Sequence, residues 1–186
     1  MRYCRGILAV FVLLGLAAGV YIGFGFYNVG ADSPHWRLTS EVLKKARASS
    51  VERYAEKTVV AIDLNDPHVV LRGAGQYAAM CTSCHLAPGV KNTELRTGLY
   101  PQPPDLTKVR LDPREAFWVI KHGIKMTAMP AWGATHDDET IWSMVAFLQQ
   151  LPDMTDAQYR DMLAKAPPDE DMEHMHESDH ASSENH

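Results

Sequence analysis

The sequence predicts an all-α protein, in which a helical domain follows a single N-terminal transmembrane helix. Three observations predict this class. The segment from Ile7 to Tyr27 has no charged residue. Later segments place their apolar residues at helical spacing, and no stretch shows the alternation of apolar and polar residues that is typical of a strand.

The apolar segment from Ile7 to Tyr27 is long enough, at about 1.5 Å per residue, to cross the ~30 Å hydrocarbon core of a bilayer. Arg2 and Arg5 precede it, and the next basic residue is Arg37. The positive-inside rule therefore predicts a cytoplasmic N-terminus and an exported remainder. A cleaved signal peptide is the alternative, but the run exceeds the roughly 7–15 apolar residues of a signal-peptide core. We expect a single-pass anchor in a bacterial inner membrane.

The segment after the membrane predicts a second helix, from Thr39 or Ser40 to about Lys57. It carries a basic cluster that either contacts lipid headgroups or a partner, or faces solvent, and the solvated face is favoured. The cluster consists of Lys44, Lys45, Arg47 and Arg53.

Three further helices follow. One begins near Val69 and leads into a pair of cysteines, and one begins with Asp112 as N-cap and ends at Gly123. The last begins near residues 135–138 and ends before Pro152. Residues 86–111 are rich in Pro and Gly, so we expect a loop there.

The pentapeptide that begins at Cys81 is the most informative feature. Cys81 and Cys84 are separated by two residues and can bond the two vinyl groups of a haem, while the adjacent His85 reaches the iron. A thioredoxin-like redox pair needs a preceding strand, and a tetrahedral zinc site needs further ligands at suitable spacing. The sequence shows neither, so the pattern predicts one covalently bound haem c.

A haem held by His85 needs a second axial ligand or an open position, and this choice separates electron transfer from catalysis. Met126 and Met129 lie in a downstream loop. The residue after Met129 is proline, which stiffens the loop and biases Met129 toward an extended backbone. We expect Met129 to be the ligand, with Met126, His122 and His136 as alternatives. A closed sixth position predicts an electron carrier; a haem peroxidase with an open one is the enzymatic alternative.

Four segments resemble class I cytochromes c, in particular membrane-anchored bacterial monohaem proteins similar to the cytochrome domains of the cbb3-type oxidase diheme subunit. They are GAGQYAAMCTSCHLAPG, GLYPQPPDL, FWVIKHGIKMTAMPAWG and DETIWSMVAFLQQLP. The resemblance implies the class I cytochrome c fold, thioether bonds at Cys81 and Cys84, and axial ligation by His85 and Met129. It also implies that the carbonyl of Pro104 orients the proximal imidazole. The oxidase subunit has two such domains, whereas this chain has one CxxCH motif.

The same resemblance implies that a helix containing Gly73 and Tyr77 crosses the C-terminal helix, with Trp142 as the partner. Several large side chains either line the haem or fill the core, and Tyr100 and Trp132 are candidates to meet a propionate. The lining candidates are Phe117, Trp118, Ile120, Trp132 and Ile141.

These assignments divide the chain into four parts. We expect residues 1–30 to form a cytoplasmic flank and a transmembrane anchor, and residues 31–68 to form a partly helical periplasmic arm. Residues 69–151 are expected to form the cytochrome c haem domain, and residues 152–186 a short helix and a disordered acidic tail. We expect one-electron transfer between respiratory or periplasmic redox enzymes. The alternative is a permanent electron-transfer subunit of a larger membrane dehydrogenase or oxidase.

The net charge and the C-terminal tail indicate which kinds of partner the protein can bind. The net formal charge of -5 excludes the basic footprint of a nucleic-acid binder, and the acidic residues are concentrated in 152–186. The tail also combines imidazoles with thioethers, which suits weak copper binding, although a solvated tail is the favoured interpretation. These residues are Met172, His174, Met175, His176, His180 and His186.

Overall fold

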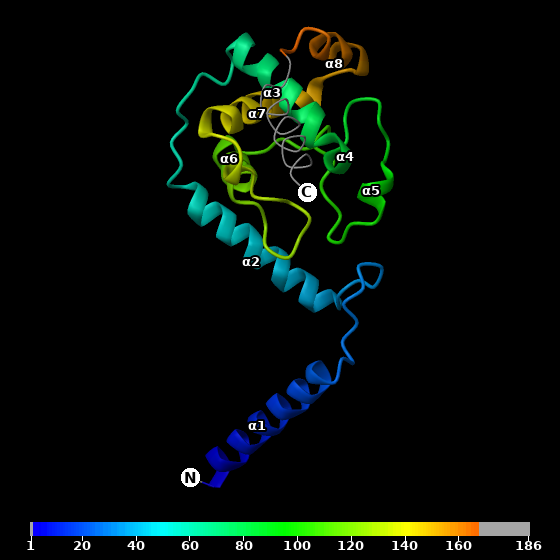
Figure 1. Ribbon diagram of the computed structural model, residues 1–186. Helices are drawn as coiled ribbons and strands as arrows, with labels where there is room; N and C mark the ends of the chain where they lie inside the picture. The colour runs from blue at the N-terminus through cyan, green and yellow to red at the C-terminus, as the bar shows by residue number, and fades with distance from the viewer. Residues whose placement is uncertain (1, 168–186) are drawn as a thin grey trace, which may run out of the picture. The chain divides into compact units, whose positions relative to one another are not determined.

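The computed structural model describes residues 2–167, and the chain divides after Pro34 into two compact units. The first contains α1 (Arg2–Gly23). The second contains α2 (Arg37–Ala55), α3 (Pro67–Met80), α4 (Thr82–His85), α5 (Glu94–Thr97), α6 (Pro113–His122), the 3-10 helix η1 (Trp132–Ala134), α7 (Asp138–Gln150), the 3-10 helix η2 (Leu151–Asp153) and α8 (Asp156–Leu163) (Figure 1). Residues 2–167 contain no strand, which confirms the predicted all-α class.

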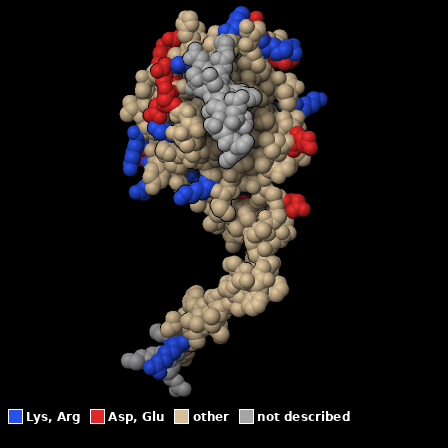
Figure 2. All heavy atoms as spheres, in the orientation of Figure 1, with Lys and Arg blue, Asp and Glu red and all other residues tan. Residues whose placement is uncertain are grey.

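The helix α1 covers the predicted transmembrane segment from Ile7 but ends at Gly23, four residues before the predicted end at Tyr27. Its stretch Arg5–Gly23 is long and apolar enough to cross a membrane, and none of it is buried within the structure. In Figure 2 this segment shows no charged side chain beyond its N-terminal end, whereas acidic and basic side chains are interspersed on the visible face of the second unit. A helix of this kind serves as a membrane anchor or as a signal sequence.

The core of the second unit is built on the crossing of α3 and α7 (Figure 1). The backbones approach closely at Gly73, where an added Cβ would lie 1.9 Å from the carbonyl oxygen of Ser143. One turn later, Tyr77 packs against Phe147 with ring centroids 5.2 Å apart. Trp142, the partner expected from the sequence, is buried in the same core cluster and stacks on an α6 ring, as described below.

The helix α6 packs on α7 through stacked Phe117 and Trp142 rings, whose centroids are 4.2 Å apart. α6 begins where predicted, because the carboxylate of Asp112 accepts hydrogen bonds from the first turn at 2.9 and 3.3 Å. Asp137 caps α7 in the same way, accepting from the Thr140 amide at 2.8 Å. Residues 140–148 of α7 are all buried, so this helix is the centre of the core.

The remaining predicted segments differ little from expectation. Within the predicted loop 86–111, the structure has one short helix, α5, whose N-cap is Thr93. α8 falls within the short helix expected after Pro152 and places Tyr159 against the core. The predicted disorder and copper binding of the tail fall on 168–186, outside the described residues.

The helix α2 packs against α6, although its sequence has few regularly spaced apolar residues. Val51 and Ala55 are its buried residues, and Tyr54 stacks on Trp118 of α6 with centroids 5.8 Å apart. α2 therefore lies in the same compact unit as α3 to α8.

Candidate functional site

A cavity of about 590 Å³ brings together all four residues that the sequence singled out: Cys81, Cys84, His85 and Met129. They come from two distant parts of the chain. Cys81 joins α3 to α4, Cys84 and His85 lie in α4, and Met129 lies in the loop between α6 and η1. The rest of the lining is mostly apolar and includes Leu106, Leu111, Val119, Ile120, Met144 and Leu148.

The two cysteines and the histidine are held on one helical turn. The amides of Cys84 and His85 both donate to the carbonyl of Cys81, at 3.1 and 2.8 Å. This hydrogen bonding fixes two thiols and one imidazole toward the same cavity. Burial raises the pKa of the Cys81 thiol to about 12, and the neighbouring Cys84 adds to the rise. The Cys81 thiol is therefore uncharged at neutral pH.

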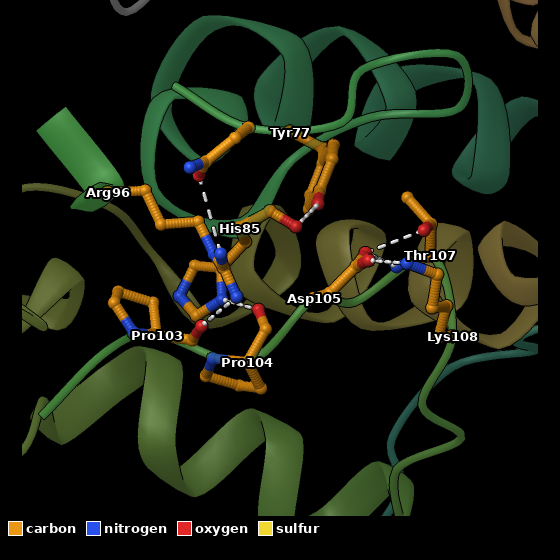
Figure 3. A network of polar contacts seen from close by, with 9 residues as sticks. Tyr77, His85, Arg96, Pro103, Pro104, Asp105, Thr107 and Lys108 are labelled. Atoms are coloured by element: carbon orange, nitrogen blue, oxygen red, sulfur yellow. Dashed lines mark hydrogen bonds and ion pairs between the residues drawn. The ribbon is translucent and has the colours of Figure 1, made fainter. Parts of the chain in front are cut away.

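The imidazole of His85 is oriented by a backbone carbonyl. Its Nδ1 lies 3.0 Å from the carbonyl oxygen of Pro104 (Figure 3). Because a carbonyl only accepts hydrogen bonds, Nδ1 carries the proton and Nε2 keeps its lone pair. Burial lowers the pKa of His85; the bond to Pro104 opposes this, and the nearby cation of Arg96 adds to it. A neutral imidazole is the form that binds a metal.

Further backbone contacts fix the turn around His85. Its carbonyl accepts from the amide of Leu106 at 3.2 Å, and the Tyr77 hydroxyl donates to the Leu86 carbonyl at 2.6 Å. Arg96 holds the proline segment by donating from Nη2 to the Pro103 carbonyl at 3.0 Å (Figure 3). The orientation of the imidazole therefore depends on α3, α5 and the proline segment together.

Met129 is presented by a tight loop. Its carbonyl accepts from the amide of Ile124 at 3.2 Å, and its amide donates to the Thr127 hydroxyl at 3.1 Å. Gly123 makes this closure feasible: its φ is +64°, and an added Cβ would lie 2.7 Å from the carbonyl carbon of Pro130. A residue with a side chain would press directly on the segment that carries Met129.

None of the three alternative ligands lines the cavity. Met126 has φ +59° and a side chain that is 97% exposed, so it faces solvent. His122 is exposed and packs beside Trp118. His136 is buried, with its Nδ1 2.8 Å from the Thr135 hydroxyl.

The structure sorts the side chains proposed to line a haem. Ile120 and Trp132 line the cavity, whereas Phe117, Trp118 and Ile141 do not. Phe117 and Trp118 stack on other rings, and Ile141 is fully buried in the core.

Two features of the cavity lining differ from what the sequence predicted. Tyr100, a candidate for meeting a propionate, does not line it, and its hydroxyl contacts α2. α2 itself supplies lining residues, namely Arg47, Ala48, Val51 and Glu52. No sequence signal indicated this, because the basic cluster of α2 resembled a solvated face.

The donor set of the cavity fits a covalently bound haem. Two thiols and a neutral imidazole share one turn, a thioether faces the same space, and the walls are apolar. Within residues 2–167, no group of three or more His, Cys, Asp or Glu side chains is arranged to hold a metal ion.

Comparison with known proteins relates the central part of the chain to a protein family. Residues 69–148 match the family described as "Cytochrome C oxidase, cbb3-type, subunit III". No curated protein and no solved structure matched the chain. The matched region begins within α3 and ends within α7, so α1 and α2 lie outside it.

Proposed function

We propose that this chain, whose residues 69–148 are a cytochrome c domain of the cbb3-type oxidase subunit III family with a single c-type haem, is a membrane-anchored periplasmic electron carrier. The observation that carries the proposal is the convergence of the Cys81–His85 turn and Met129 on one apolar cavity. Two axial ligands leave no open iron position for a substrate, so the site suits one-electron transfer between redox proteins.

Each site residue has a defined role in this proposal. Cys81 and Cys84 would hold the haem through thioether bonds, and His85 and Met129 would ligate its iron. The bound haem supplies a one-electron iron couple, whose potential a thioether ligand raises. Pro104 orients His85, and Gly123 allows the loop to present Met129. The apolar walls exclude water, and the rigid surroundings limit rearrangement when the charge changes.

The apolar helix α1 supports a proposal about the location. We propose that α1 stays attached as a single-pass anchor, with its N-terminus in the cytoplasm and the haem domain in the periplasm. Its basic N-terminal end and its length support this assignment. In this arrangement the carrier exchanges electrons with respiratory or periplasmic enzymes.

The full-length protein in bacterial membranes tests the proposal. We expect a haem-stained band that resists acid-acetone extraction and stays in the membrane pellet after an alkaline wash. The solubilised protein should give a low-spin spectrum and a one-electron Nernst curve. A high-spin spectrum would instead favour catalysis at an open position. Sizing then separates the two carrier hypotheses, because stable co-elution with other redox subunits would indicate a permanent subunit.

A further inference from the structure

We propose that Arg47 of α2 binds a propionate of the haem, so that a helix outside the matched cytochrome domain completes the haem site. This inference rests on the haem site proposed above and adds a residue that neither the CxxCH motif nor the family match includes.

The helix α2 is fixed on both sides of Arg47. Toward its N-terminus, the Tyr100 hydroxyl lies 3.2 Å from the Ser40 hydroxyl and accepts a hydrogen bond from the His35 amide at 3.2 Å. Toward its C-terminus, Tyr54 stacks on Trp118. Contacts at both ends hold Arg47 at a defined position along the cavity wall.

Arg47 differs from the other basic residues of α2. It is half-buried and lines the cavity, whereas Lys44, Lys45 and Arg53 are exposed and do not. Its side chain makes no hydrogen bond or ion pair with any residue between 2 and 167, while Lys44 pairs with Glu41 at 3.0 Å. A guanidinium that faces an apolar cavity without a counter-ion is costly, so the site calls for an anion inside the cavity.

The charges of the cavity wall favour the same conclusion. Glu52 and Glu115 also line it, and Arg47 is the one Lys or Arg that does so among the described residues. The two propionates of a haem add further negative charge to this wall. Arg96 is a weaker candidate, because it does not line the cavity and two of its N–H groups donate to Pro103 and Asn92.

The position of α2 agrees with the chemistry of haem attachment. The vinyl groups and the propionates occupy opposite edges of the macrocycle, and the two cysteines fix the vinyl edge at the α3–α4 turn. α2 lines the same cavity but, within the described residues, contacts α6 and neither α3 nor α4. It is therefore placed at a part of the wall away from the thioether bonds, where propionates are expected.

The reduction potential of full-length protein in detergent tests this proposal. Removing a cation next to the haem stabilises the oxidised iron, so Arg47→Gln should lower the potential. We expect a shift of roughly tenfold in the Fe(II)/Fe(III) equilibrium, which is ~59 mV for a one-electron couple. Arg47→Lys should restore most of it. Arg53→Gln is the matched control, because it makes the same charge change on the same helix at an exposed position.

All variants should keep the covalent pigment and the weak sulfur-to-iron band, which report the proposed function separately. If Arg47→Gln had the potential of Arg53→Gln, or if it lost the sulfur-to-iron band, the propionate assignment would be overturned. Should Arg47→Gln fail to accumulate, Arg47→Lys carries the test. Its altered hydrogen-bond geometry should shift the propionate carboxylate band in redox-difference infrared spectra, and an unshifted band would overturn the assignment.

Discussion

Replacing Gly73 with alanine should strongly destabilise the haem-loaded protein, because the α3–α7 crossing leaves no space for a side chain. The added Cβ would lie 1.9 Å from the carbonyl oxygen and 2.4 Å from the carbonyl carbon of Ser143. Both are backbone atoms of a helix buried along its length. No rotamer change relieves this clash, so the two helices must separate.

The size of the effect follows from these distances. Ordinary contact begins near 3.4 Å, so the crossing has to open by roughly 1.5 Å. Such a gap weakens the packing of Tyr77 on Phe147 as well. Overpacking a core typically costs about 1–3 kcal/mol, and backbone-on-backbone contact belongs at the upper end. We expect a loss of about 3 kcal/mol in the free energy of unfolding, a large part of the roughly 5–15 kcal/mol of a typical domain.

Guanidinium denaturation of the purified full-length protein, followed by haem absorbance and helical circular dichroism, measures this loss. Gly75→Ala is the matched control, because it lies on the same helix and its Cβ would meet Ala166 at an ordinary 3.5 Å. Alanine favours helix over glycine by about 1 kcal/mol, so the control should be neutral or stabilised. Equal stability of the Gly73→Ala and Gly75→Ala proteins would refute the reasoning.

Two further predictions concern the loop and a helix cap. Gly123→Ala forces a residue with a Cβ into φ +64° and toward Pro130, so it should displace Met129 and weaken the sulfur-to-iron band; Gly98→Ala, which has space and an ordinary φ, should not. Asp137→Ala removes the cap of α7 and should cost about 1 kcal/mol at pH 7 in urea denaturation. The amide of Thr140 holds the pKa of Asp137 below its usual 3.8, so this stabilisation is present above that pH and is lost as pH falls through the folded pKa.

Each of these has a clear contrary result. An unchanged sulfur-to-iron band in Gly123→Ala would mean that the position of Met129 does not depend on the close approach of residue 123 to Pro130. A stability difference between the Asp137→Ala protein and the parent that persists unchanged to pH 3 would mean that the carboxylate charge does not act at the cap.

The parts of the site that the sequence predicted are local in the chain. Cys81, Cys84 and His85 lie within one turn, so their spacing alone places them together. The start of α6 was equally readable, because Asp112 accepts a hydrogen bond from an amide two residues away, whereas the start of α7 was predicted only to within residues 135–138. Short-range interactions of this kind can be predicted from residues that are neighbours in the sequence.

What the sequence did not reveal depends on contacts between distant segments. α2 has only two buried residues, Val51 and Ala55, too few to give a periodic signal, and its place on α6 comes from tertiary packing. Arg47 looked like one member of a solvated basic cluster, and only the packing of α2 separates it from its neighbours. The stacking of Trp142 on Phe117 likewise depends on how α6 meets α7.

The visible absorbance spectrum of the oxidised full-length protein, compared between Met129→Leu and Met126→Leu, tests the central claim most directly. Met129 lines the cavity, whereas Met126 is 97% exposed. The proposed haem site predicts that Met129→Leu loses the weak sulfur-to-iron band and that Met126→Leu retains it. A band that survives in Met129→Leu, or disappears in Met126→Leu, would contradict it.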